Sequence, residues 1–298
     1  TDWRYQNSLP FYKRNYENLV LLSKQIELQA INATSSALTG KETIKLTLDS
    51  KLKRTHEIIS RFDTSYSKLP LNKTFRADIS KAKILYRESE VNLQRGNLLQ
   101  ASEILRECQE ITENCDSQVN AWIRNYFEAF PEWEKWIKQT IYQSRQNQSV
   151  AIIVDKFEHK CYVYKKGKVI AEYNAEFGPN WIGDKNYSGD KATPEGKYFI
   201  TRKLGQKETR YYKALLLNYP NTDDLSRFKE ALKNGTIPPG KNIGNLIEIH
   251  GDGGKGMNWT DGCIALENKC MDELFSLANT GNPVVIVGSM NPLPDISW

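Results

Sequence analysis

Glycine and proline are distributed unevenly along this chain, and that asymmetry limits the folds open to it. Of 18 glycines, only Gly40 and Gly96 precede residue 150, and eight of the 11 prolines follow it. Both residue types mark turns and interrupt regular helices, so a segment that lacks them is typical of long helices. The 298 residues therefore predict two domains of different architecture, at the usual ~100–200 residues per domain.

The first half shows helical periodicity. Apolar residues recur at helical spacing in residues 16–31, 52–62 and 79–93. Residues 85–105 resemble a single tetratricopeptide-type helical hairpin, with Gly96 at the turn and Ala101 at the helix contact. An ordinary helical bundle accounts for the same pattern, so the two interpretations stay open.

The end of the first half is also expected to be helical. Helices are predicted over residues 117–130 and 131–146, because Pro131 suits the first turn of a helix. An aromatic cluster in these helices is interpreted as core or as packing against the next domain, with a ligand platform as the alternative; it consists of Trp122, Phe127, Phe130, Trp133 and Trp136.

From residue 150 the hydrophobic period changes to two, which is typical of strands. Strands are predicted at 151–154, 161–164, 169–173, 197–202, 214–218, 246–250 and 284–287. Two helices are predicted at 223–233 and 268–278, with Asp223 and Asn268 as their N-caps. The expected organisation is an all-α domain at 1–148, a mainly-β domain at 149–290 and a C-terminal tail at 291–298.

Charge and hydropathy exclude some classes of protein. The net charge is only +5 and no block of Lys or Arg is present, which argues against nucleic-acid binding. A solvated surface explains this balance, and a polyanionic neighbour such as a bacterial cell wall is the alternative. No apolar run approaches the ~18 residues of a membrane span. Because the chain starts at Thr1 without a signal peptide, we expect a processed mature chain or a trimmed one.

The chain has five cysteines and three histidines, so there are few candidates for a thiol nucleophile and its base. An odd number of cysteines leaves at least one free thiol, and none has the spacing of a zinc site. His250 ends an apolar strand and precedes Gly251, and Cys263 follows in a Thr-Asp-Gly-Cys turn. A thiol nucleophile needs a base and donors for the oxyanion. From these residues alone, Cys263 is either half of a catalytic dyad with His250 or a buried structural cysteine.

Two segments then carry a family resemblance. Ile249-His-Gly251 followed by Thr260-Asp-Gly-Cys-Ile264 resembles the signature of the L,D-transpeptidase catalytic domain, or YkuD-like, family. Gly189-Asp-Lys-Ala-Thr-Pro-Glu-Gly-Lys-Tyr198 resembles that family's Thr-Pro-x-Gly turn and strand. Tyr219-Pro-Asn and Gly-Cys-x-Ala are closer to its YafK-like branch. The resemblance covers residues 149–288 and implies a β-sandwich or barrel with short helices.

The resemblance implies an envelope enzyme that acts on peptidoglycan stem peptides. Cys263 would be the nucleophile and His250 the general base, with a thiol pKa low enough to populate the thiolate at neutral pH. Gly262 and Cys263 would supply oxyanion-hole amides, and the Thr260 carbonyl would orient the His250 ring. The reaction needs no metal or organic cofactor.

The sequence also departs from the family pattern. The residue before Gly-Cys is usually His and here is Asp261, and the residue two after Cys is commonly Arg and here is Ala265. An Arg can pair bidentately with a substrate carboxylate, so its loss puts substrate recognition in doubt. Asp261 either binds a substrate amine or caps a turn. Other candidate substrate contacts are Trp259, Trp181, Tyr187 and Tyr219.

Three functions are compatible with these residues. The first is a periplasmic L,D-transpeptidase of cell-wall biogenesis and cell shape that forms 3–3 cross-links or attaches a D-amino acid or protein to the stem. The second is a hydrolytic L,D-carboxypeptidase or amidase of the same fold. The third is a non-catalytic wall-binding scaffold, whose helical half could recruit an envelope protein.

Overall fold

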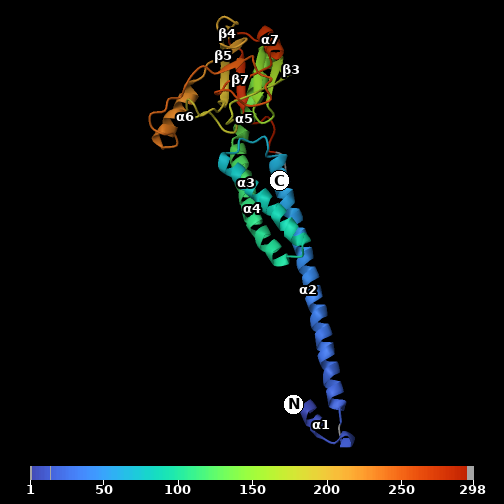
Figure 1. Cartoon of the computed structure of the whole chain (residues 1–298). Coiled ribbons are helices and arrows are strands. Elements are labelled where there is room, and N and C mark those ends of the chain that lie inside the picture. Colours follow the sequence, from blue (N-terminus) through green and yellow to red (C-terminus); the bar gives the residue numbers. More distant parts are fainter. Residues whose placement is uncertain (1, 14, 294–298) are drawn as a thin grey trace. The chain divides into compact units, whose positions relative to one another are not determined.

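The computed structural model of the chain describes residues 2–13 and 15–293 (Figure 1), so residues 294–298 of the predicted tail lie outside it. The chain divides into two compact units, one of residues 1–67 and 73–116, the other of residues 68–72 and 117–298. Within the described ranges, no helix is both long enough and apolar enough to cross a bilayer.

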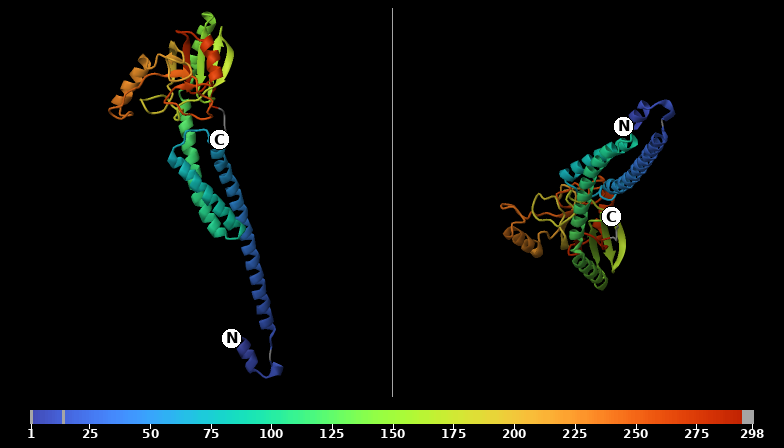
Figure 2. Two further views of the ribbon diagram at one scale, coloured as in Figure 1. Left: turned by 45° about the horizontal axis from the view of Figure 1, so that its top comes forward. Right: turned by 90° about the horizontal axis from the view of Figure 1, so that it is seen from below.

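The first unit is entirely helical, as predicted. It contains α1 (Asp2–Ser8), the 3-10 helix η1 (Phe11–Lys13), α2 (Glu17–Asp63), α3 (Lys73–Gln94) and the first part of α4 (Leu98–Phe127). The two helices predicted at 16–31 and 52–62 are parts of the single helix α2, because no proline interrupts the segment between them. Helices α3 and α4 lie alongside the C-terminal part of α2 (Figures 1 and 2).

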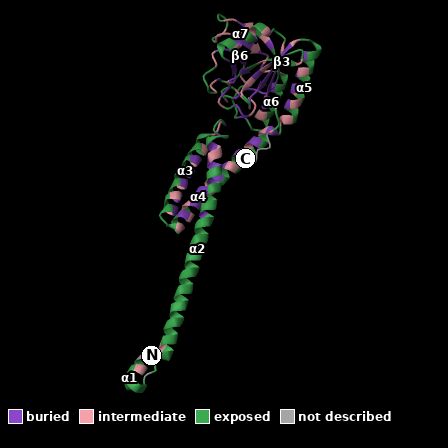
Figure 3. Ribbon diagram, turned by 90° about the vertical axis from the view of Figure 1, so that its right-hand side faces the viewer, coloured by how far each residue is buried: buried purple, intermediate pink, exposed green. Residues whose placement is uncertain are grey.

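The helical hairpin predicted at 85–105 is present. Gly96 lies between α3 and α4 with a φ of +80°, a conformation that glycine adopts without steric cost. Ala101 is fully buried, and the Ser89 hydroxyl donates to its carbonyl oxygen at 2.8 Å. Leu52 and Ile59 of α2 join this core. Among the described residues of α2, burial begins only at Leu48, and the preceding turns are exposed (Figure 3).

The second unit is built on one eight-stranded sheet with strand order β3-β2-β1-β8-β4-β5-β6-β7. The strands are β1 (Val150–Asp155), β2 (Lys160–Lys165), β3 (Lys168–Asn174), β4 (Gly196–Leu204), β5 (Ala214–Leu217), β6 (Glu248–His250), β7 (Ile264–Ala265) and β8 (Pro283–Val287). All are close to predicted strands except β7, which is too short to show a period.

The sheet curls because its two outer strands are bridged. Glu176, just after β3, exchanges two backbone hydrogen bonds with Ala265 of β7, at 2.9 and 2.8 Å. Most neighbouring strands are antiparallel, but β1–β8 and β6–β7 are parallel. This closure carries β7, and the turn before it, to the middle of the domain.

Helices cover the rest of the second unit. Helix α6 (Thr222–Lys233) contacts the start of β4 through its first turns, because the Tyr198 hydroxyl donates to Asp224 at 2.9 Å; Figure 2 shows it in orange. Its N-cap is Asn221 instead of the predicted Asp223, because the extended Asn221 accepts the amides of Asp223 and Asp224 with its side chain. Helix α7 (Asn268–Leu277) is capped by Glu267 instead of the predicted Asn268.

Helix α5 (Phe130–Gln146) packs on β1 and β8, so the second unit begins before the sheet. Trp133 and Phe127 are buried, as the core interpretation of the aromatic cluster predicts. The Trp133 ring lies so close to Gly288 that a Cβ there would be 2.1 Å from it. The predicted domain boundary at 148/149 separates two kinds of secondary structure, whereas packing groups residues 117–148 with the sheet.

Candidate active site

Strands β6 and β7 place His250 and Cys263 on one face of the sheet. The two strands are parallel, with Ile249 opposite Ile264 and His250 opposite Ala265. If the same pairing is extended by one residue towards the N-terminus, Glu248 lies opposite Cys263. Side chains alternate between the faces of a sheet, so Glu248, His250 and Cys263 share a face. The register thus places the two residues of the predicted dyad on the same face of neighbouring segments.

The imidazole of His250 is buried and held in one orientation. Its Nδ1 is 2.6 Å from the Gly251 carbonyl oxygen. Because a carbonyl can only accept, Nδ1 carries the proton and Nε2 is the unprotonated nitrogen. Nε2 is buried and has no hydrogen-bond partner among the described residues. The carbonyl that orients the ring is therefore that of Gly251, not that of Thr260 as expected.

Aromatic rings enclose the His250 imidazole. Tyr211 stacks on it with ring centroids 3.5 Å apart and planes 4° from parallel. Trp259 meets it edge-on at 5.8 Å, and the Trp259 indole donates to Glu176 at 2.8 Å. Trp259 thus lies beside His250, and its contact with substrate stays a prediction; Tyr211 was not singled out from the sequence.

The turn that carries Cys263 is shaped by Thr260. The Thr260 hydroxyl donates to the Cys263 carbonyl at 2.7 Å and accepts the Gly262 amide at 3.2 Å. Gly262 has a φ of +130°, and a Cβ there would lie 2.7 Å from the Ala192 carbonyl oxygen, so this position favours glycine. The Cys263 thiol donates to the Leu246 carbonyl at 3.6 Å. The thiol hydrogen bond in this structure is thus to backbone and not to His250.

Burial keeps both groups of the pair uncharged. It raises the pKa of the Cys263 thiol to about 11, and it lowers the pKa of His250 to about 4. The thiolate that the resemblance implied at neutral pH is therefore not the resting state here. The physical reason is that a charged form loses hydration in a closed pocket, and no preformed ion pair compensates for that loss.

This charge state predicts how Cys263 reacts with an alkylating agent. Only the thiolate is nucleophilic, so its rate with iodoacetamide should rise about tenfold per pH unit from pH 7 to about pH 10, since the pKa is about 11. The rate is measured by mass spectrometry of the Cys263 peptide, with an unfolded peptide of the same sequence as control. A rate that is already constant below pH 7 would contradict the uncharged resting pair.

The loop between His250 and Cys263 is pinned to β7. Gly253 donates to the Leu266 carbonyl at 2.9 Å. A Cβ at Gly253 would lie 2.8 Å from the Leu266 backbone, so glycine permits this approach. Asn268, which was expected to cap α7, accepts the Asp252 amide at 2.6 Å instead. The glycine-rich spacer is therefore a loop that packs tightly across the strand.

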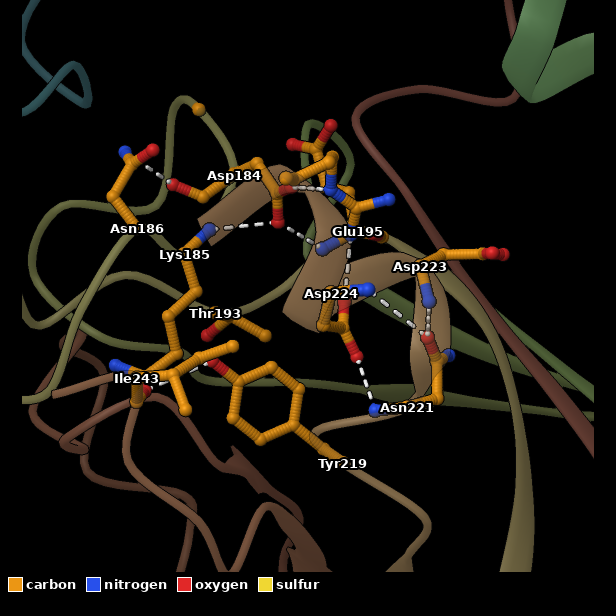
Figure 4. Close-up of polar contacts among 12 residues, drawn as sticks. Asp184, Lys185, Asn186, Thr193, Glu195, Tyr219, Asn221, Asp223, Asp224 and Ile243 are labelled. Carbon is orange, nitrogen blue, oxygen red and sulfur yellow. Dashed lines mark hydrogen bonds and ion pairs between the residues drawn. The ribbon is translucent and has the colours of Figure 1, made fainter. Parts of the chain in front are cut away.

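The other predicted contact residues lie in different surroundings. Trp181 is only 2% exposed and packs against Phe157 and His159, so its role here is in the core. Tyr187 is half-buried with Lys241 over its ring. Tyr219 is buried, and its hydroxyl donates to the Ile243 carbonyl at 3.1 Å (Figure 4). Asp261 is exposed next to the Cys263 turn.

A buried polar network supports the Thr-Pro-Glu-Gly segment. Lys156 is fully buried; it pairs with Glu195 at 2.7 Å and donates to the carbonyls of Gly183 and Thr193. Figure 4 shows the continuation through Asp184, which accepts the Glu195 amide at 2.7 Å. The sequence did not reveal this network, because its members come from distant segments.

The same segment reaches the Cys263 turn. Lys185 pairs with Asp190 at 2.7 Å and also donates to the Asp261 carbonyl at 3.4 Å. Asp190 accepts the amides of Asn186 and Tyr187, which closes the loop on itself. Two motifs that lie some 70 residues apart in the sequence are thus in contact, and the first supports the backbone on which Cys263 is mounted.

Part of the chain is similar to known proteins. Residues 149–286 match the family model of the L,D-transpeptidase catalytic domain, YkuD. This segment is a YkuD domain. The protein YafK of Escherichia coli (strain K12), which bears the name of an L,D-transpeptidase, is 31% identical over 106 residues. That alignment spans 36% of this chain and 34% of YafK, so the chain matches about a third of the relative's length.

Solved structures are similar to about half of this chain. Bd1075 of Bdellovibrio bacteriovorus is 25% identical, with a TM-score of 0.38 over 50% of this chain and 52% of that one. An L,D-transpeptidase from Mycobacterium smegmatis is 16% identical, with a TM-score of 0.28 over 46% and 58% of the two chains.

Proposed function

We propose that this protein is a cysteine-dependent L,D-transpeptidase that acts on the tetrapeptide stems of peptidoglycan. The observation that carries the proposal is the unpartnered, unprotonated Nε2 of His250, which shares a sheet face with the Cys263 thiol in a YkuD domain. A histidine buried for packing alone would satisfy both ring nitrogens. An open Nε2 beside a thiol is what a general base requires.

The uncharged pair sets the order of steps. His250 Nε2 accepts the thiol proton as the Cys263 sulfur attacks the carbonyl carbon that precedes the terminal D-Ala. The tetrahedral intermediate then collapses as His250 returns the proton to the leaving amine, which releases D-Ala and leaves a thioester. An acceptor amine attacks the thioester, and the new amide bond forms as the thiol is regenerated.

The oxyanion of each intermediate needs donors. The amides of Gly262 and Cys263 are our candidates, since both belong to the turn that carries the sulfur. In this structure the Gly262 amide donates to the Thr260 hydroxyl at 3.2 Å. Use of this amide therefore requires it to exchange the hydroxyl for the oxyanion, and an oxyanion is the stronger acceptor.

We place this reaction in the periplasm or cell envelope, where its substrate lies. The helical first unit offers a surface for an envelope protein, although no motif in it indicates which one. Water in place of the acceptor amine would make the same acyl-enzyme an L,D-carboxypeptidase or amidase.

Product analysis tests the proposal. The protein is incubated with disaccharide-tetrapeptide, and the products are identified by mass spectrometry. We expect a dimer with loss of D-Ala, or an adduct with an added amine. Tripeptide as the sole product would assign hydrolysis instead. Unchanged tetrapeptide at high enzyme concentration would leave only the wall-binding scaffold.

A further inference from the structure

The YkuD domain lacks a cation where its sequence signature commonly has one. Ala265 occupies the position two after Cys263, and it is fully buried in the sheet with its backbone paired to Glu176. A substrate with a free C-terminus nevertheless carries a carboxylate one residue beyond the carbonyl that Cys263 would attack. If that carboxylate is recognised, the cation has to come from another segment of the chain.

Arg210 supplies a cation at the site from the loop between β4 and β5. Its guanidinium carbon lies 4.8 Å from the centre of the Tyr211 ring, and it donates to the Tyr211 hydroxyl at 2.5 Å. Tyr211 in turn stacks on His250 at 3.5 Å. The guanidinium is therefore oriented by a ring that is itself packed on the candidate base.

Arg210 is exposed, and in the described part of the chain it forms no ion pair with a carboxylate. By contrast, Lys185 and Lys213 pair with Asp190 and Asp272. Glu248 is within electrostatic reach, because the Arg210 charge lowers the pKa of Glu248 against the larger raising effect of burial. Its charge also acts on the thiol, because it lowers the pKa of Cys263 against the larger raising effect of burial. An oriented cation within electrostatic reach of the nucleophile, and without an ion pair to a carboxylate among the described residues, is suited to an anionic ligand.

We propose that Arg210 binds the C-terminal carboxylate of the acyl-donor peptide and so selects stems with a free terminus. This inference rests on the proposed function for the identity of the peptide. The planar guanidinium presents two parallel N–H donors to a carboxylate, and such charge-assisted bonds are stronger than neutral ones. Tyr211 is then a positioning residue for Arg210 on one side and for His250 on the other.

Binding to an inactive protein tests this role apart from catalysis. The full chain with Cys263→Ala is titrated by calorimetry with a tetrapeptide stem and with the same peptide as its C-terminal amide. We expect the free acid to bind about 10- to 100-fold more tightly, the range of a hydrogen-bonded charge pair. With Arg210→Gln added, the free acid and the amide should bind equally well. Arg210→Lys should keep part of the preference for the free acid, because lysine keeps the charge but not the planar fork.

Two matched variants test whether Arg210 or another nearby cation binds the carboxylate. Lys207→Gln removes an exposed charge from the same loop, and it should leave the ratio unchanged. Lys255 lies over the ring of Trp259, which meets His250 edge-on, so loss of the ratio in Lys255→Gln but not in Arg210→Gln would overturn the inference. Equal binding of acid and amide would overturn it as well. If the ratio behaves as expected but the wild type yields no product from tetrapeptide, the proposed function fails and the carboxylate site stands.

Discussion

Replacement of Cys263 with alanine is expected to lower the rate of D-Ala release from tetrapeptide by at least about 10³-fold. The thioester cannot form without the sulfur. Among the described residues, no other thiol faces the site: Cys161 is a buried residue of β2, and Cys270 lies on α7. D-Ala release is measured with wild type and variant at matched concentration. Intact-mass analysis with substrate should show an acyl adduct on the wild type only.

Cys270→Ala is the matched control for this change. Cys270 is partly exposed on α7, so its loss removes a thiol without touching the Thr260–Cys263 turn. Wild-type rates are expected for this variant. Comparable D-Ala release from Cys263→Ala and wild type would mean that Cys263 is not the nucleophile, and the dyad assignment would have to be abandoned.

Replacement of His250 with glutamine is expected to lower kcat by about 10²- to 10⁴-fold at neutral pH. Because the pKa of the Cys263 thiol is raised to about 11, hardly any thiolate exists at neutral pH unless a base removes the proton. Without His250, the remaining activity should climb with pH towards that value. In the wild type, His250 has a pKa of about 4, so kcat/KM should fall only as acid protonates the imidazole near that pH.

The pH profile separates a catalytic role from a structural one. A variant that had merely lost packing would show a uniformly lower rate with the profile of the wild type. His56→Gln, at an exposed position of α2, controls for loss of a histidine elsewhere. Identical pH profiles for His250→Gln and wild type would contradict general-base catalysis by His250.

Local patterns predicted most of the secondary structure. The period-two segment of β4 forms a strand whose side chains alternate between a buried and a more exposed side of the sheet. Strands β1 and β8 are buried on both sides and are recognised as short apolar runs instead. The hairpin at Gly96 was readable because only a residue tolerant of positive φ suits that turn. In contrast, β7 has two residues, and a period cannot be recognised over so short a segment.

The chemistry of the site was predicted only in part. A strand end and a glycine turn made His250 and Cys263 candidates, and the resemblance to the L,D-transpeptidase signature is what gave them the roles of base and nucleophile. The expected charge state of the pair, a thiolate at neutral pH, was wrong. A pKa depends on burial, which no local sequence pattern reports. Tyr211 and Arg210 were missed for a related reason: they reach His250 from the β4–β5 loop through strand pairing between β5 and β6.

The amino-acid sequence by itself determined the two architectures, most strand and helix positions, and the candidate thiol and base. The architectures and elements follow from backbone preferences and hydrophobic spacing, which act between residues close in the chain, whereas the thiol and base came from the family resemblance. Only the tertiary structure decided which carbonyl orients His250, that the pair rests uncharged, and that an arginine from another loop stands beside it. Those properties depend on desolvation and on distances between segments, and the curled sheet sets both when it joins β7 to the chain that follows β3.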